Sequence, residues 1–142
     1  MKKLTISIAI VLFSLVGYTQ QVSIISNEEF QAKVWNYTDT TNTEFNFIGD
    51  KPTIVHFWGS WAAPCKRTDT LLLEMQNEYK DKINIYTLGR QNGDVFKAFK
   101  VKRVPTILFI SKDGKYESVL GDMTKEEMTK MIEDKLFTKS ED

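Results

Sequence analysis

The chain has 142 residues, of which 42% are hydrophobic and 27% are charged, and 19 basic residues balance 19 acidic ones. This amount of apolar material suffices for one compact core, so a single domain is expected. The balanced charge provides no overall positive field of the kind that supports sequence-independent nucleic-acid binding, and the recurrent hydrophobic runs exclude a disordered chain.

The first 20 residues have the pattern of an export signal. Lys2 and Lys3 form a positive segment, residues 4–16 form a predominantly apolar run, and residues 17–19 supply a small-residue cleavage pattern. The apolar run is shorter than the roughly 20 residues that span a bilayer. We therefore expect an exported, periplasmic protein with no membrane attachment after cleavage, and an uncleaved anchor is the alternative. The expected division is a signal peptide over 1–20, one domain over 21–137 and a polar tail over 138–142.

A capping box begins the first predicted helix. The Ser26 side chain can accept a hydrogen bond from the first helical turn while Glu29 reaches back to the cap, and Phe30 starts an apolar stripe. The spacing predicts a helix that ends at about Tyr37. A stretch rich in Thr, Asn and Asp follows over 38–46 and is expected to be a surface loop.

The central strand is predicted over Thr53–Trp58, because this run is almost continuously apolar and β-branched, as in a strand buried on both faces. Gly59 and Ser60 then form a turn, and Pro64 suits the first turn of a helix. A long helix beginning beside Cys65 is predicted from side chains at helical spacing, namely Thr68, Leu71, Leu72, Met75 and Tyr79.

The second half of the chain predicts two further strands, a hairpin and two helices. Gly114 can take the positive φ that a hairpin turn needs, and Thr124 with Glu127 forms a second capping box. The order of elements indicates a mixed sheet covered by helices on both faces. The expected elements are a strand over 83–88, a helix over 94–99, a strand over 106–111, an antiparallel strand over 116–120, and a closing helix with Met128, Met131, Ile132 and Leu136 on its apolar face.

The run from Phe57 to Lys66 resembles the active-site segment of thioredoxins, in which a W-C-x-P-C-K motif opens a helix after a strand. The resemblance extends over about residues 24–137: Val104-Pro105-Thr106 resembles the family's cis-proline loop, and Gly121 matches a glycine beside the substrate groove. It implies the α/β thioredoxin fold, a mixed sheet with helices on both faces, a C-terminal strand hairpin and a closing helix. Residues 50–52, which directly precede the predicted central strand, are similar to the corresponding segment of thioredoxin-like proteins exported by Bacteroidetes.

Cys65 is the only cysteine, although an exported protein meets oxidising surroundings. In thioredoxins a solvent-facing thiolate attacks a substrate disulfide, and a second, more buried thiol resolves the mixed disulfide. The position of the attacking thiol is Ala62, and Cys65 matches the resolving position. Ordinary dithiol exchange is therefore excluded for the chain as it stands, and no intramolecular disulfide can form.

Two explanations of Ala62 remain open: a natural loss of reductase activity, or an altered active-site variant of a disulfide reductase. Other departures from the family pattern favour natural loss. His56 occupies the place of a buried acid, and Thr87 that of a lysine that often pairs with it. Arg90 stands in what is commonly an acidic run, and Thr70 stands where a proline often kinks the long helix.

His56 is the only histidine. A neutral imidazole beneath the start of the Cys65 helix can accept the thiol proton, which would make Cys65 a monothiol oxidoreductase acting on a small thiol or a partner's cysteine. The alternative is a buried histidine that bonds to backbone and fills the space of the missing acid. One Cys and one His are too few for a structural zinc site, so no metal is expected, nor any other cofactor.

A peptide-binding groove is the other candidate site. Trp61 either offers a flat apolar platform or shields the turn, whereas Trp58 is expected to close the core. A cis bond before Pro105 would turn the Val104 amide and carbonyl outward to pair with an extended peptide; the alternative is that Pro105 only shapes its loop. The expected partner is a polypeptide or a thiol-containing protein, bound by a monomer. The candidate groove residues are Trp61, Ala63, Pro64, Val104, Pro105 and Gly121.

Overall fold

The computed structural model describes residues 21–37 and 44–137. The predicted signal peptide, the first part of the predicted loop over 38–46 and the polar tail lie outside the described residues. In chain order the elements are β1 Ser23–Ile24, α1 Asn27–Lys33, β2 Thr53–Trp58, α2 Ala63–Tyr79, η1 Lys80–Lys82, β3 Asn84–Gly89, α3 Gly93–Ala98, β4 Thr106–Ile110, β5 Tyr116–Leu120, α4 Lys125–Met131 and η2 Ile132–Phe137.

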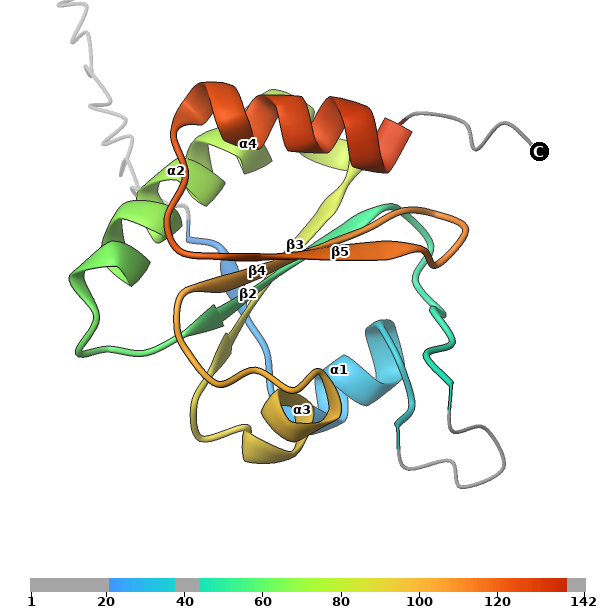
Figure 1. Cartoon of the computed structure of the whole chain (residues 1–142). Coiled ribbons are helices and arrows are strands. Elements are labelled where there is room, and N and C mark those ends of the chain that lie inside the picture. The colour runs from blue at the N-terminus through green and yellow to red at the C-terminus, as the bar shows by residue number, and fades with distance from the viewer. Residues whose placement is uncertain (1–20, 38–43, 138–142) are drawn as a thin grey trace, which may run out of the picture.

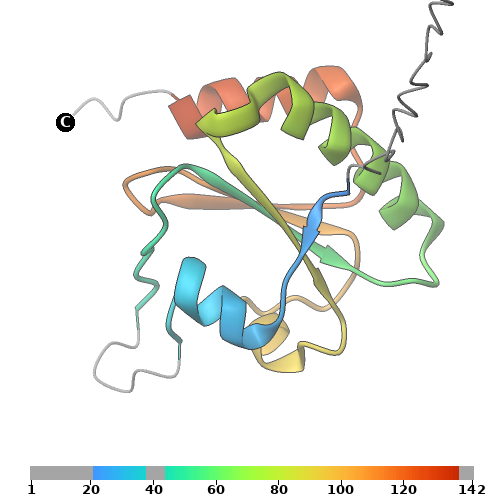
Figure 2. The same cartoon turned by 180° about the vertical axis from the view of Figure 1, so that it is seen from behind.

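The five strands form one mixed sheet in the order β1-β3-β2-β4-β5. The first three strands in this order run parallel, and β4 and β5 are antiparallel to their neighbours. Helices α2 and α4 cover one face of the sheet, and α1 and α3 cover the other (Figures 1 and 2). This arrangement confirms the fold expected from the sequence, including the C-terminal strand hairpin and the closing helix.

Side chains of the central strand alternate between two hydrophobic cores, as the period of a β-strand requires. Ile54 packs with the residues of α2 and α4, and Val55 and Phe57 pack with those of α1 and α3. His56 shares the period of Ile54 and therefore faces α2. The single histidine is thus directed toward the helix that carries Cys65.

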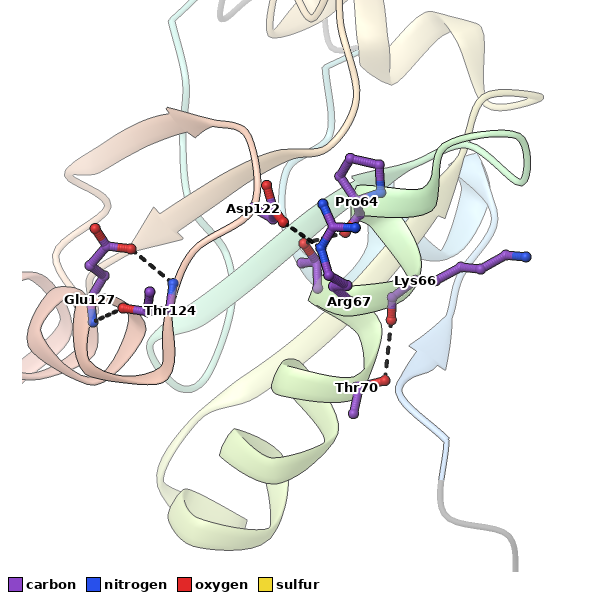
Figure 3. A network of polar contacts seen from close by, with 8 residues as sticks. Pro64, Lys66, Arg67, Thr70, Asp122, Thr124 and Glu127 are labelled. Carbon is purple, nitrogen blue, oxygen red and sulfur yellow. Dashed lines mark hydrogen bonds and ion pairs between the residues drawn. The ribbon is translucent and has the colours of Figure 1, made fainter.

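Both predicted capping boxes are confirmed. The Glu29 amide donates to Ser26 Oγ at 3.2 Å, and the Ser26 amide donates to the Glu29 carboxylate at 3.0 Å. Thr124 and Glu127 exchange the same pair of bonds at 2.8 and 3.2 Å (Figure 3). Gly114 has the predicted positive φ, 85°.

Three local features differ from the prediction. β1 was not expected, because two residues are too few to show a period, and its pairing depends on β3. α1 ends at Lys33 rather than near Tyr37, since the amides of Val34 and Trp35 both donate to the Phe30 carbonyl and the chain leaves the helix there. The closing helix widens into π-type turns from Ile132, while Ile132 itself stays in the core.

The strand register brings four loop segments to one end of the sheet. Trp58 at the end of β2 pairs with Gly89 at the end of β3, and Thr106 at the start of β4 lies opposite Phe57 and Leu120. The segments that follow Trp58, Gly89 and Leu120, and the one that precedes Thr106, therefore emerge together. Among the described residues, no helix combines the length and apolarity that crossing a bilayer requires.

Candidate functional site

The turn between β2 and α2 carries the position of the missing thiol. The Ala62 amide donates to the Gly59 carbonyl at 3.1 Å, and the Cys65 amide donates to the Ala62 carbonyl at 3.0 Å. Trp61 is 66% exposed and its indole folds back over Gly59, where an added Cβ would lie 2.7 Å from the ring. A larger residue at 59 would therefore displace the Trp61 indole from this position. Ala62 is half-buried and is the N-cap residue of α2, where its side chain makes no capping hydrogen bond.

Cys65 lies in the first turn of α2 and is completely buried. Burial raises the pKa of its thiol, a backbone hydrogen bond from Gly59 lowers it, and the nearby Asp69 carboxylate raises it further. The net pKa is higher than that of an ordinary cysteine, even though a helix N-terminus favours a thiolate. Of its neighbours, Ala63 is exposed and Pro64 is half-buried.

The peptide bond between Val104 and Pro105 is cis, as predicted. Pro105 is buried, and its carbonyl accepts a hydrogen bond from the Gly121 amide at 2.9 Å. Gly121 has a φ of 99°, which favours glycine at this position. Val104 is half-buried, and within the described part of the chain its peptide group makes no backbone hydrogen bond.

An ion pair ties the start of α2 to the segment after β5. Arg67 Nε donates to Asp122 Oδ2 at 2.7 Å, and Figure 3 shows this contact beside Pro64. Asp122 follows Gly121, which is bonded to Pro105. The structure thus links the Cys65 helix to the cis-proline loop through Arg67, Asp122 and Gly121.

His56 is completely buried, and its closest charged neighbour is Asp69, one turn after Cys65 on α2. His56 Nδ1 lies 3.0 Å from Asp69 Oδ1, but the two groups are not aligned as a hydrogen bond, and neither ring nitrogen has a hydrogen-bond partner among the described residues. The predicted backbone bond of His56 is therefore wrong. Sequence reasoning missed Asp69, although its i+4 spacing from Cys65 places it on the same helix face.

Replacing His56 with leucine is expected to raise the free energy of unfolding by about 1 kcal/mol. The change removes two buried nitrogens that lack hydrogen bonds and keeps a side chain of similar volume. Equilibrium urea unfolding of His56→Leu measures the effect, with His56→Asn, which keeps a polar group, as the control. A leucine variant less stable than the unaltered protein would show that the Asp69 contact stabilises the fold.

Trp58 does not close the core as expected. It is half-buried, its Nε1 has no hydrogen-bond partner among the described residues, and it lines a cavity of about 240 Å³ together with Asp69 and Thr87. The Thr87 hydroxyl, on the strand beside His56, also lacks a partner there. Within residues 21–37 and 44–137, no three His, Cys, Asp or Glu side chains gather in a way that would hold a metal ion.

Comparison with known proteins places the chain beside thioredoxins. The Thioredoxin family model matches residues 21–134. A thioredoxin from Borreliella burgdorferi is 31% identical over 111 residues, which cover 78% of this chain and 93% of that protein. A chloroplastic M-type thioredoxin from Spinacia oleracea is 30% identical over 102 residues, 71% of this chain and 56% of that protein. The crystal structure of chloroplastic thioredoxin z superimposes with a TM-score of 0.64 at 19% identity, covering 81% of this chain and 94% of that one.

Proposed function

The chain belongs to the thioredoxin family, and from that premise we propose that it is an exported member which has lost two-thiol exchange and keeps a groove for extended polypeptide. It holds or docks a polypeptide partner without changing the partner's disulfides. Export is proposed from the charged and apolar pattern of residues 1–20, and the periplasm is the proposed location. The similarity of residues 50–52 to thioredoxin-like proteins exported by Bacteroidetes supports the proposal of an exported member of that type.

The observation that carries this proposal is the contrast between positions 62 and 65. Two-thiol exchange needs an accessible sulfur that attacks and a second sulfur that resolves the mixed disulfide. Ala62 offers a methyl group at the first position, and Cys65 at the second is completely buried with a raised pKa. The chain therefore lacks the opening step of the reaction.

A monothiol reaction at Cys65 is less well supported. It would need an accessible or ionised sulfur and a base directed at it. Cys65 is neither exposed nor easily ionised, and His56 Nδ1 lies against Asp69. No hydrogen bond or ion pair joins His56 to Cys65 among the described residues. The burial of Cys65 thus favours binding over catalysis.

The groove retains the features that strand addition uses. An extended peptide binds a protein through main-chain hydrogen bonds to an unpaired backbone segment, and side-chain contacts add to them. Val104 supplies the unpaired amide and carbonyl, and the exposed indole of Trp61 supplies an apolar surface. Neither feature involves the missing sulfur, so binding is independent of the lost reaction.

Removing the Trp61 indole tests the groove. The probe is a fluorescein-labelled, unstructured neutral peptide of Val, Thr, Gln and Ser, and its affinity is measured by fluorescence anisotropy. Trp61→Ala is expected to weaken binding about tenfold, because aromatic anchors contribute strongly to interfaces. Ile24→Ala is the matched control: Ile24 is 64% exposed but lies on the edge strand β1, which β3 separates from β2, and its loss should leave the affinity unchanged. Equal affinities for all three proteins, or no binding at all, would refute the groove.

A further inference from the structure

A basic pocket lies between α3 and the segment that leads to Val104. It has a volume of about 450 Å³, and its lining includes four exposed cationic side chains around two apolar ones. None of the four cations has a carboxylate partner among the described residues. The cations are Arg90, Lys97, Lys100 and Lys102, and the apolar residues are Phe96 and Val101.

The positive charge is local to this part of the chain. Residues 90–103 contain five basic residues and one acidic residue, Asp94, although the whole chain is balanced at 19 of each. Like charges gathered at one place repel each other, and an anionic ligand relieves that repulsion. The pocket is thus complementary to negative charge, whereas the protein as a whole is not.

The pocket continues the proposed groove. Arg90 directly follows Gly89, which pairs with Trp58 at the end of the sheet. The Arg90 guanidinium lies 5.8 Å from the centre of the Trp61 ring, within the range of a cation–π contact. On the other side, Lys102 stands two residues before Val104 in the chain. A peptide that contacts Trp61 therefore lies beside Arg90, and its extension toward Lys102 would reach the rest of the pocket.

Building on the proposed function, we propose that the groove selects acidic polypeptide segments, whose Asp and Glu side chains occupy the basic pocket. A peptide fits better than a nucleic acid, because the local excess of basic residues falls within the short segment 90–103 and the balanced chain provides no extended field along a phosphate backbone. The apolar lining of Phe96 and Val101 also accepts the hydrophobic side chains of a peptide. Exposed charge pairs are individually weak and screened by salt, so the preference requires several carboxylates together.

Two labelled peptides of equal length test this selection. The first is the neutral peptide used above, and in the second four Gln or Ser positions carry Glu. At low salt the acidic peptide is expected to bind about tenfold more tightly, and high salt should remove the difference. A single-stranded oligonucleotide of equal charge serves as the competing ligand, and tighter binding of the oligonucleotide would overturn the proposal.

Reversing the charge of two lysines tests whether the preference for the acidic peptide arises in the basic pocket. Lys97→Glu combined with Lys102→Glu is expected to abolish the tenfold advantage of the acidic peptide over the neutral peptide. The matched control combines Lys80→Glu with Lys82→Glu, which makes the same change in net charge in η1, beyond the far end of the 17-residue helix α2, about 25 Å from Cys65. All four lysines are exposed, and equal melting temperatures will confirm that both variants are folded.

The outcomes separate this inference from the proposed function. If the neutral peptide binds but the acidic peptide binds no more tightly, the charge selection is wrong and the groove stands. If neither peptide binds, the groove itself fails and the selection fails with it. Equal losses in the two charge-reversal variants would show that net charge, rather than the pocket, determines affinity.

Discussion

Replacing Ala62 with cysteine is expected to give this protein an insulin-reducing activity that the unaltered chain lacks. Ala62 is the N-cap of α2, three residues before Cys65, and its carbonyl accepts a hydrogen bond from the Cys65 amide, so a thiol at 62 would stand beside the buried sulfur. The new thiol can attack a disulfide and Cys65 can then resolve it. In the presence of dithiothreitol, Ala62→Cys should reduce insulin at least about tenfold faster than dithiothreitol alone.

A variant with a different spacing between the two thiols is the control in this experiment. Ala63→Cys also provides a second thiol on the same turn, at an exposed position, but without the spacing that the family uses. It should stay close to the dithiothreitol background. If Ala62→Cys is no faster than the unaltered protein, the loss of activity has another cause than the missing thiol.

Cys65 itself is expected to resist alkylation strongly in the folded protein. At neutral pH, iodoacetamide should label it about 100-fold more slowly than in the urea-unfolded chain, because the thiol is completely buried and its raised pKa leaves little thiolate. Asp69→Asn removes a charge that raises this pKa and should therefore increase the labelling rate at a given pH. Equal rates in the folded and unfolded protein would contradict the shielding of Cys65.

The raised pKa of the Cys65 thiol determines whether the stability of the fold rises or falls with pH. The folded protein holds the Cys65 proton more tightly than the unfolded chain does, so above the ordinary thiol pKa the folded state binds more protons. Below that ordinary pKa both states hold the proton, and the thiol causes no change of stability with pH. As the pH rises above it, the free energy of unfolding decreases. Comparing Cys65→Ser with the unaltered protein across alkaline pH isolates the effect, because the serine variant lacks this ionisation.

Local sequence signals predicted the elements that depend on neighbouring residues. The capping boxes at Ser26 and Thr124 need only a partner three residues away, and the strand over Thr53–Trp58 shows its burial in its own composition. The cis bond before Pro105 was predicted from the family resemblance. β1 could not be predicted in this way, since its two residues are held only by pairing with β3.

The parts of the site that were missed depend on contacts across the fold. Asp69 meets His56 only because α2 packs over β2 at a particular rotation, which no local pattern specifies. Arg90 reaches Trp61 because β2 and β3 end at the same level of the sheet. Lys97 and Lys102 join Arg90 only through the path of the chain after α3. The charge excess over 90–103 is visible in the sequence, but its position beside the groove is not.

Mass spectrometry of the unaltered protein after incubation with a disulfide-bonded client polypeptide at neutral pH tests the central claim most directly. The account predicts that the intact mass of the protein remains unchanged, because no sulfur able to attack the client is accessible. A covalent adduct between Cys65 and the client would contradict it.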